Sequence, residues 1–98
     1  MKMTQLMIKK GNPEILSSIR RAIENELKIM ELSIQKTQNN ISLLEDKYGL
    51  KTSTFLEQLQ KNIISDDNLD FIDWQGELKL LQSLQDEYSE LKEVVLCE

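Results

Sequence analysis

A heptad pattern between residues 23 and 48 constrains this chain more than any other feature of its sequence. Apolar residues recur there at alternating steps of four and three, a spacing that forms a seam along one side of an α-helix. The seam positions are Ile23, Leu27, Met30, Ile34, Thr37, Ile41, Leu44 and Tyr48. Thr37 is the single polar interruption. A helix cannot bury such a seam alone, so the pattern predicts a partner helix, either in this chain or in another.

The helix that carries the seam is expected over residues 13–48. Asn12 suits the N-cap, Pro13 suits the first helical position, and Gly49 suits the position just after a helix end. A helix of this length extends for about 54 Å at about 1.5 Å per residue. Three apolar residues beside the seam would widen the apolar face, which is more typical of a bundle than of a two-stranded coiled coil. These residues are Ile29, Leu32 and Leu43.

A short helix is expected next, over residues 53–61. Thr54 and Glu57 match a capping box, in which the two side chains satisfy the free backbone N–H groups of a helix start. Thr52 or Ser53 would serve as alternative caps. The spacing therefore predicts a helix start near residue 53 without fixing which residue caps it.

The last helix is expected over residues 70–96, after the polar stretch 65–68. Asp70 and other acidic residues near its start favour the positive end of the helix dipole. Gly76 lies inside this helix, where glycine costs about 1 kcal/mol relative to alanine. Close approach of another helix beside Trp74 would compensate for that cost.

The fold class predicted from these elements is all-α: a long, coiled-coil-like antiparallel helical hairpin with a short connecting helix. Residues 13–98 would form this hairpin domain, and residues 1–12 would be an N-terminal arm or a short strand. The chain has 98 residues, of which 40% are hydrophobic and 5% aromatic. Because an elongated chain of this size buries little of its surface, a homo-oligomer or another protein partner is expected.

Charge is divided unevenly along the chain. Residues 1–36 hold seven basic and four acidic residues, a net charge of +3, whereas residues 37–98 hold five basic and thirteen acidic residues, a net charge of −8. Either the two helix faces attract each other, or the acidic part docks on a basic partner and steers its approach. Direct DNA binding would need a concentrated basic surface, and Lys9, Lys10, Arg20 and Arg21 offer little of one.

The residue types leave little room for catalysis or metal binding. The chain has no His, and its one cysteine, Cys97, stands without a His partner. The acidic stretch before the last helix has calcium-loop spacing at Asp66, Asn68, Asp70 and Glu77. Phe71, however, occupies the position that needs glycine, so helix capping explains these acids better. No enzymatic activity and no cofactor are expected.

The sequence also shows neither a signal peptide nor a run of about 18 apolar residues that could span a membrane. Cytoplasmic localisation is therefore the expectation.

Three motifs give the chain a resemblance to known proteins. They are Asp46-Lys47-Tyr48-Gly49-Leu50, Phe55-Leu56 and Asp70-Phe71-Ile72-Asp73-Trp74-Gln75-Gly76. This pattern resembles a group of small helical prokaryotic proteins that look like antitoxin components of toxin–antitoxin modules. The resemblance covers roughly residues 40–92 and implies a cognate protein toxin as partner, often a small RNase-like protein. The chain departs from the pattern between Lys61 and Asp67, where Asn62-Ile63-Ile64-Ser65 stands in place of a glycine-containing segment.

The function expected from this resemblance is neutralisation of a toxin by occlusion of its active site. Partner binding would use four charged residues and two aromatic anchors, although aromatic residues of this kind more often belong to a core. These residues are Asp66, Asp67, Asp70, Phe71, Asp73 and Trp74. Two alternatives stay open: a structural homodimeric coiled coil or scaffold, and a DNA-binding autoregulator that uses residues 1–21. The homodimer would close through the seam residues Leu27, Met30, Ile34, Ile41 and Leu44.

Overall fold

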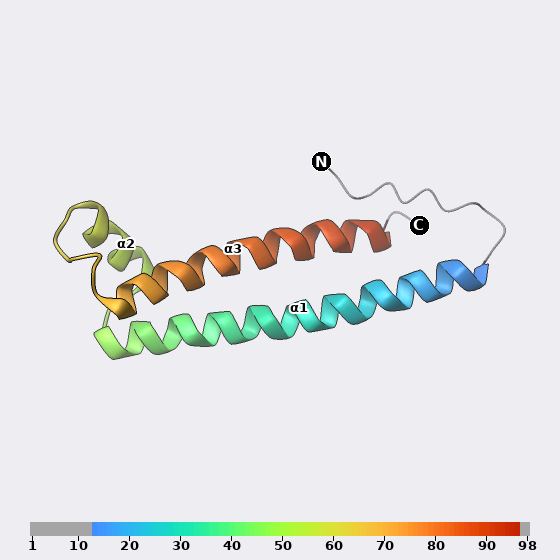
Figure 1. Ribbon diagram of the computed structural model, residues 1–98, viewed down its shortest axis with the longest axis horizontal. Helices are drawn as coiled ribbons and strands as arrows, with labels where there is room; N and C mark the ends of the chain where they lie inside the picture. Colours follow the sequence, from blue (N-terminus) through green and yellow to red (C-terminus); the bar gives the residue numbers. More distant parts are fainter. Residues whose placement is uncertain (1–12, 97–98) are drawn as a thin grey trace. The chain divides into compact units, whose positions relative to one another are not determined.

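The structure is a computed structural model that describes residues 13–96, and this part of the chain consists of helices and short connections. The elements are α1 (Pro13–Tyr48), α2 (Thr52–Gln60) and α3 (Leu69–Leu96) (Figure 1). Helix α1 packs against α3, which confirms the predicted all-α helical hairpin with a short connecting helix. Helix α1 has the expected bounds, and α2 and α3 each begin one residue earlier than expected. The expected arm or strand over residues 1–12 lies outside the described residues, as do Asn12 and Cys97.

The internal contacts divide the chain into two units. Within the described residues, unit 1 combines residues 13–34 of α1 with residues 83–96 of α3, and unit 2 is residues 35–82. Both long helices therefore contribute to both units, whereas α2 belongs wholly to unit 2.

The end of α1 in unit 2 follows the prediction. Gly49 has a φ of +62°, the left-handed conformation that a residue with a β-carbon adopts at a cost. The backbone N–H of Leu50 donates to the carbonyl of Glu45 at 3.1 Å, so one of the free carbonyls of the last turn gains a partner. The helix thus ends at Tyr48 because Gly49 turns the chain, and α2 starts after a three-residue connection.

The start of α2 differs from the predicted capping box of Thr54 and Glu57. Lys51 is the N-cap residue, and its own side chain makes no capping hydrogen bond. Instead, Glu45 of α1 accepts two hydrogen bonds at Oε2 from Thr52, one from the backbone N–H at 2.7 Å and one from the hydroxyl at 2.8 Å. The short connection brings this carboxylate to the helix start, so Thr54 and Glu57 are not needed there.

Helix α2 ends through a motif that the sequence analysis did not anticipate. Asn62 adopts a positive φ of 56°, and its backbone N–H donates to Leu59 at 3.1 Å. The N–H of Ile63 donates to the carbonyl of Gln58 at 2.9 Å. This pair of bonds is the Schellman arrangement, in which Asn is the usual substitute for Gly. Asn62 thereby supplies the chain reversal for which the resemblance predicted a glycine.

The start of α3 is capped locally. The side chain of Asn68 accepts a hydrogen bond at Oδ1 from the backbone N–H of Asp70, at 2.8 Å. Ser65 and Asp67 hydrogen-bond to each other in the preceding turn. Capping therefore accounts for much of the polar stretch before this helix, in agreement with the interpretation that set a calcium loop aside.

Unit 2 has an aromatic core built from all three helices. Phe55 of α2 stacks on Trp74 of α3, with ring centroids 3.9 Å apart and planes 3° from parallel. Phe71 packs at a tilt against Phe55, and Tyr48 of α1 packs in the same way against Phe71, with centroids 5.2 and 5.0 Å apart. Ile41 completes the buried cluster. The short helix is thus fixed to the hairpin by aromatic contacts at its centre.

The seam of α1 is packed within the same chain. Leu27, Met30 and Ile41 are buried, Ile34 and Leu44 are half-buried, and the polar Thr37 is buried among them. Helix α3 covers this seam because the hairpin brings it alongside α1. These residues therefore pack against α3 within one chain, and their assignment to a dimer interface stays a prediction.

The apolar residues beside the seam are left uncovered. Ile29, Leu32 and Leu43 are 56%, 71% and 66% exposed. A two-helix hairpin covers only a narrow stripe, so the wider apolar face that suggested a bundle remains at the surface of this chain.

No other helix of the described chain packs closely against Gly76. It is exposed, and a β-carbon built at this position meets no atom within 4 Å. The expected packing of a neighbouring helix against this glycine is therefore wrong. Trp74 is buried by the aromatic core instead.

Replacing this glycine is expected to stabilise the fold. Gly76→Ala removes the conformational freedom of glycine in the unfolded chain and meets no clash, so the free energy of unfolding should rise by about 1 kcal/mol. Urea unfolding followed by circular dichroism measures this change. A decrease in stability would show that the site has a steric constraint that the open space around Gly76 does not reveal.

Candidate protein-binding surface

The two expected aromatic anchors lie in the core. Trp74 has 0% of its surface exposed and Phe71 has 8%. The indole N–H of Trp74 donates to the hydroxyl of Thr52 at 3.2 Å, so its polar atom also has an internal partner. A side chain without exposed surface has nothing to offer a partner while the fold is intact. The assignment of Phe71 and Trp74 to partner binding is corrected on this ground.

Asp70 is engaged inside unit 2. Its Oδ2 accepts hydrogen bonds from Lys47 Nζ at 2.6 Å and from the hydroxyl of Tyr48 at 2.5 Å. The bond from Lys47, followed by that from Tyr48, lowers the pKa of Asp70 below its ordinary value. The same bonds raise the pKa of Lys47 and of Tyr48, because each donor loses its partner when it loses its proton. Asp70 therefore joins the start of α3 to the end of α1.

The Asp70 contacts predict how stability depends on pH. Since the pKa of Asp70 is lowered by folding, its contribution is present above the unfolded pKa of about 4 and is lost as the pH falls through the folded value. Asp70→Asn should lower the Tm at pH 7, and the difference from the parent chain should shrink towards pH 3. Asp66→Asn, at an exposed position, is the control and should not change the Tm at pH 7. A difference in Tm between Asp70→Asn and the parent chain that stays constant with pH would contradict this role of Asp70.

The other acidic residues expected to meet a partner are at the surface. Asp66 and Asp67 are exposed in the turn before α3, and Asp73 is exposed on α3 itself. Asp73 helps to line a hollow of about 680 Å³ in unit 2. The lining residues are Asn40, Leu43, Leu44, Ile72, Asp73, Gly76 and Glu77. A hydrogen bond of 3.2 Å from Asn40 Nδ2 to Glu77 Oε2 joins α1 to α3 at this hollow.

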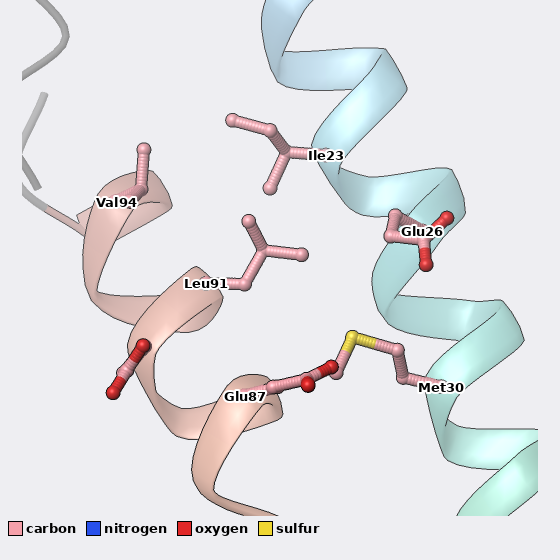
Figure 2. A pocket seen from close by; sticks show the side chains of 7 residues that line it. Ile23, Glu26, Met30, Glu87, Leu91 and Val94 are labelled. Atoms are coloured by element: carbon pink, nitrogen blue, oxygen red, sulfur yellow. The ribbon is translucent and has the colours of Figure 1, made fainter. Parts of the chain in front are cut away.

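Unit 1 holds a second hollow, which we call the unit 1 groove. Its volume is about 460 Å³, and it lies between α1 and α3. The lining residues are Ile23, Glu26, Met30, Glu87, Glu90, Leu91 and Val94. Figure 2 shows Ile23 and Leu91 pointing towards each other from the two helices, with the side chain of Met30 extending towards α3. Apolar side chains thus form the floor of the groove.

Every charged residue that lines the unit 1 groove is acidic. Glu26 comes from α1, Glu87 and Glu90 come from α3, and all three are exposed. In the hairpin the two helices therefore bring like charges together around an apolar floor, an arrangement that costs free energy unless a cation offsets it. Such a groove suits an apolar segment that carries basic side chains.

A polar contact between α1 and α3 lies close to the groove in sequence. The hydroxyl of Tyr88 donates to Glu31 Oε2 at 3.0 Å, and this bond raises the pKa of Tyr88. Lys92 Nζ lies 5.6 Å from the centre of the Tyr88 ring. Glu31 is thus engaged with Tyr88, whereas Glu26, Glu87 and Glu90 line the groove and are exposed.

Among residues 13–96, no three His, Cys, Asp or Glu side chains are grouped as a metal site. Asp70 and Glu77, two of the residues with calcium-loop spacing, instead hydrogen-bond to Lys47 and Asn40. None of the described helices is both long enough and apolar enough to cross a membrane. Exposed apolar side chains and exposed carboxylates are present among the same residues.

Most of the unit 1 groove was missed in the sequence analysis. Ile23 and Met30 were placed on the seam, but Glu26, Glu87, Glu90 and Val94 were not singled out. Glu26, Glu87 and Glu90 each stand one residue before a position that faces the partner helix, namely Leu27, Tyr88 and Leu91. Acidic residues repeated beside the apolar positions of both helices are the signal that would have found the groove.

Comparison of the chain with protein-family models, with curated proteins and with solved structures gives no match in any of the three.

Proposed function

We propose that this chain is a protein-binding, antitoxin-like module that neutralises a partner toxin by covering its active site. The observation that carries the proposal is the unit 1 groove, whose apolar floor is edged by Glu26, Glu87 and Glu90. This chemistry favours a basic segment with apolar side chains on the partner. Apolar contact would supply affinity, and the glutamates would select for Lys or Arg and speed association.

Other acidic residues support the same kind of partner. Asp66, Asp67 and Asp73 are exposed, whereas Asp70 is bonded to Lys47. The chain as a whole carries a net charge of −5. Such a surface raises the local concentration of a basic protein before contact is made, and added salt weakens this effect.

The proposal is tested by expressing the full chain together with the protein encoded beside its gene. We expect the two to co-purify and the growth defect caused by that neighbour to be relieved. Glu26→Lys should weaken the complex by about tenfold, because it reverses one charge at the groove and repels a basic partner. Glu24→Lys is the matched control, since Glu24 is exposed on the same helix but does not line the groove. Equal effects of the two variants would overturn the assignment to the groove, and absence of a complex would overturn the function.

A second candidate function is a structural homodimer, favoured by the exposed apolar residues of unit 1. Ile29 and Leu32 lie one helical turn apart and are more than half exposed. Since the seam is already covered by α3, such a dimer would use this second face. Light scattering on the full chain and on Leu32→Asp distinguishes the two functions. A parent chain that is dimeric and a variant that is monomeric would favour the homodimer. If the parent chain and the variant are both monomers, the homodimer function is ruled out.

A further inference from the structure

The part of α3 that belongs to unit 2 carries an exposed apolar stripe, which we call the α3 stripe. Its members Leu69, Ile72 and Leu80 are between 47% and 77% exposed. Together with Gly76 they follow one another at steps of three, four and four residues, so all four lie along one side of the helix. Trp74 belongs to the opposite side, which packs in the core. An exposed apolar stripe with helical spacing is typical of a surface that packs against a further helix.

Gly76 stands at the middle of the α3 stripe, and the packing of unit 2 does not explain it. Glycine destabilises a helix interior relative to alanine, yet a β-carbon built at this position meets no atom within 4 Å. No described helix of the same chain uses the space that the missing side chain leaves. A helix of another molecule can use it, because small side chains at a crossing let two helix axes approach to about 8 Å.

The charged residues beside the α3 stripe make it complementary to itself. At about 100° per residue, Asp73 and Glu77 lie on one side of Gly76 and Lys79 lies on the other. When two copies of α3 pack in the same direction about a two-fold axis, the Lys79 side of each copy meets the acidic side of the other. Lys79 is then only about 3 Å along the axis from Glu77 of the other copy. In an antiparallel pair the two acidic sides would meet and repel each other.

We propose that two copies of this chain associate through the α3 stripe, with the two α3 helices parallel and Gly76 at their closest approach. Such a two-fold interface brings Ile72 and Leu80 against the same residues of the second copy. This inference goes beyond the proposed function and does not depend on it, because the partner toxin is assigned to the unit 1 groove. It also differs from a homodimer through Ile29 and Leu32, which lie on α1.

Analytical ultracentrifugation of the full chain over a range of concentrations tests the proposal. We expect a reversible dimer, which Gly76→Glu should weaken by about tenfold or more, because it places a carboxylate at the closest approach of the two helices. Ser89→Glu is the matched control, since it adds the same charge at an exposed position of α3 outside the stripe, and it should leave the dissociation constant unchanged. Circular dichroism verifies that both variants keep their helix content, which the open space around Gly76 allows.

Cysteine cross-linking tests the direction of the two helices. Ile72→Cys and Leu80→Cys, each combined with Cys97→Ser, should each form a disulfide with a second copy of the same variant under mild oxidation. A parallel pair places identical positions within the roughly 4.4–6.8 Å that a disulfide requires between α-carbons. Leu32→Cys in the same background is the control and should stay unlinked.

Several results would overturn the proposal. A parent chain that stays monomeric at every concentration would exclude a second copy as the occupant, and Gly76→Glu would then show through co-purification whether a different protein covers the stripe. Equal effects of Gly76→Glu and Ser89→Glu would remove the α3 stripe from the interface. Disulfides that form only when the Ile72→Cys and Leu80→Cys variants are mixed would contradict the parallel direction, and a disulfide at Leu32→Cys alone would place the interface on α1. The comparison of Glu26→Lys with Glu24→Lys tests the proposed function separately, so the two proposals fail independently.

Discussion

Trp74→Ala is expected to lower the free energy of unfolding by about 3–5 kcal/mol, the range observed when a buried aromatic residue is truncated. Trp74 has no exposed surface, and its ring stacks on Phe55 at 3.9 Å. Truncation leaves a cavity where the three helices of unit 2 meet and removes the hydrogen bond to Thr52. Urea unfolding monitored by circular dichroism measures the change, because the substitution removes the one tryptophan that fluorescence would report.

Two comparisons show whether the loss comes from the aromatic core. Trp74→Phe keeps a ring against Phe55 and should cost less than the alanine variant. Ile72→Ala lies two residues away on the same helix, where the side chain is 48% exposed, and should change stability by about 1 kcal/mol or less. If Trp74→Ala proved as mild as Ile72→Ala, Trp74 would not be the centre of the core, and the anchor role that its burial excludes would have to be reconsidered.

The helices were predictable because their signals are local. The heptad steps in α1, the proline at its start and Gly49 at its end determine a helix whose observed bounds are the predicted ones. The last helix likewise starts after a polar stretch and ends where expected. Local periodicity also predicts that the long helices are paired, since two helices with one apolar stripe each can bury those stripes only against each other or against another chain.

What the sequence left undecided concerns contacts between residues that are distant in the chain. Whether the seam closes within one chain depends on how α3 returns along α1, which no local pattern specifies. The core position of Trp74 depends on Phe55 and Tyr48, which lie on other helices. The unit 1 groove combines Glu26 with Glu87 and Glu90, so its acidic character appears only once the two helices are paired.

The cap of α2 is the sharpest example of this limit. Thr54 and Glu57 have the spacing of a capping box, yet the structure uses Glu45, seven residues before Thr52 and on another helix. Glu45 accepts the backbone N–H of Thr52, and because α2 already begins at Thr52, Thr54 lies inside the helix and not at its cap. A pattern of four residues cannot reveal that a better acceptor arrives from the preceding helix.

Thr52→Val is expected to cost about 1–3 kcal/mol, because it removes a hydroxyl that holds two hydrogen bonds without changing the shape of the side chain much. The hydroxyl accepts from the indole of Trp74 at 3.2 Å and donates to Glu45 at 2.8 Å, so it joins α3, α2 and α1 in one chain of bonds. Without it, the indole N–H stays buried and unsatisfied. Thr54→Val is the matched control: it should be nearly neutral if Glu45 caps the helix, and as costly as Thr52→Val if the capping box does. The free energy of unfolding of Glu45→Gln, measured alone and combined with Thr52→Val, completes the test. Because the two groups belong to one chain of hydrogen bonds, the double variant should lose less stability than the sum of the two single losses.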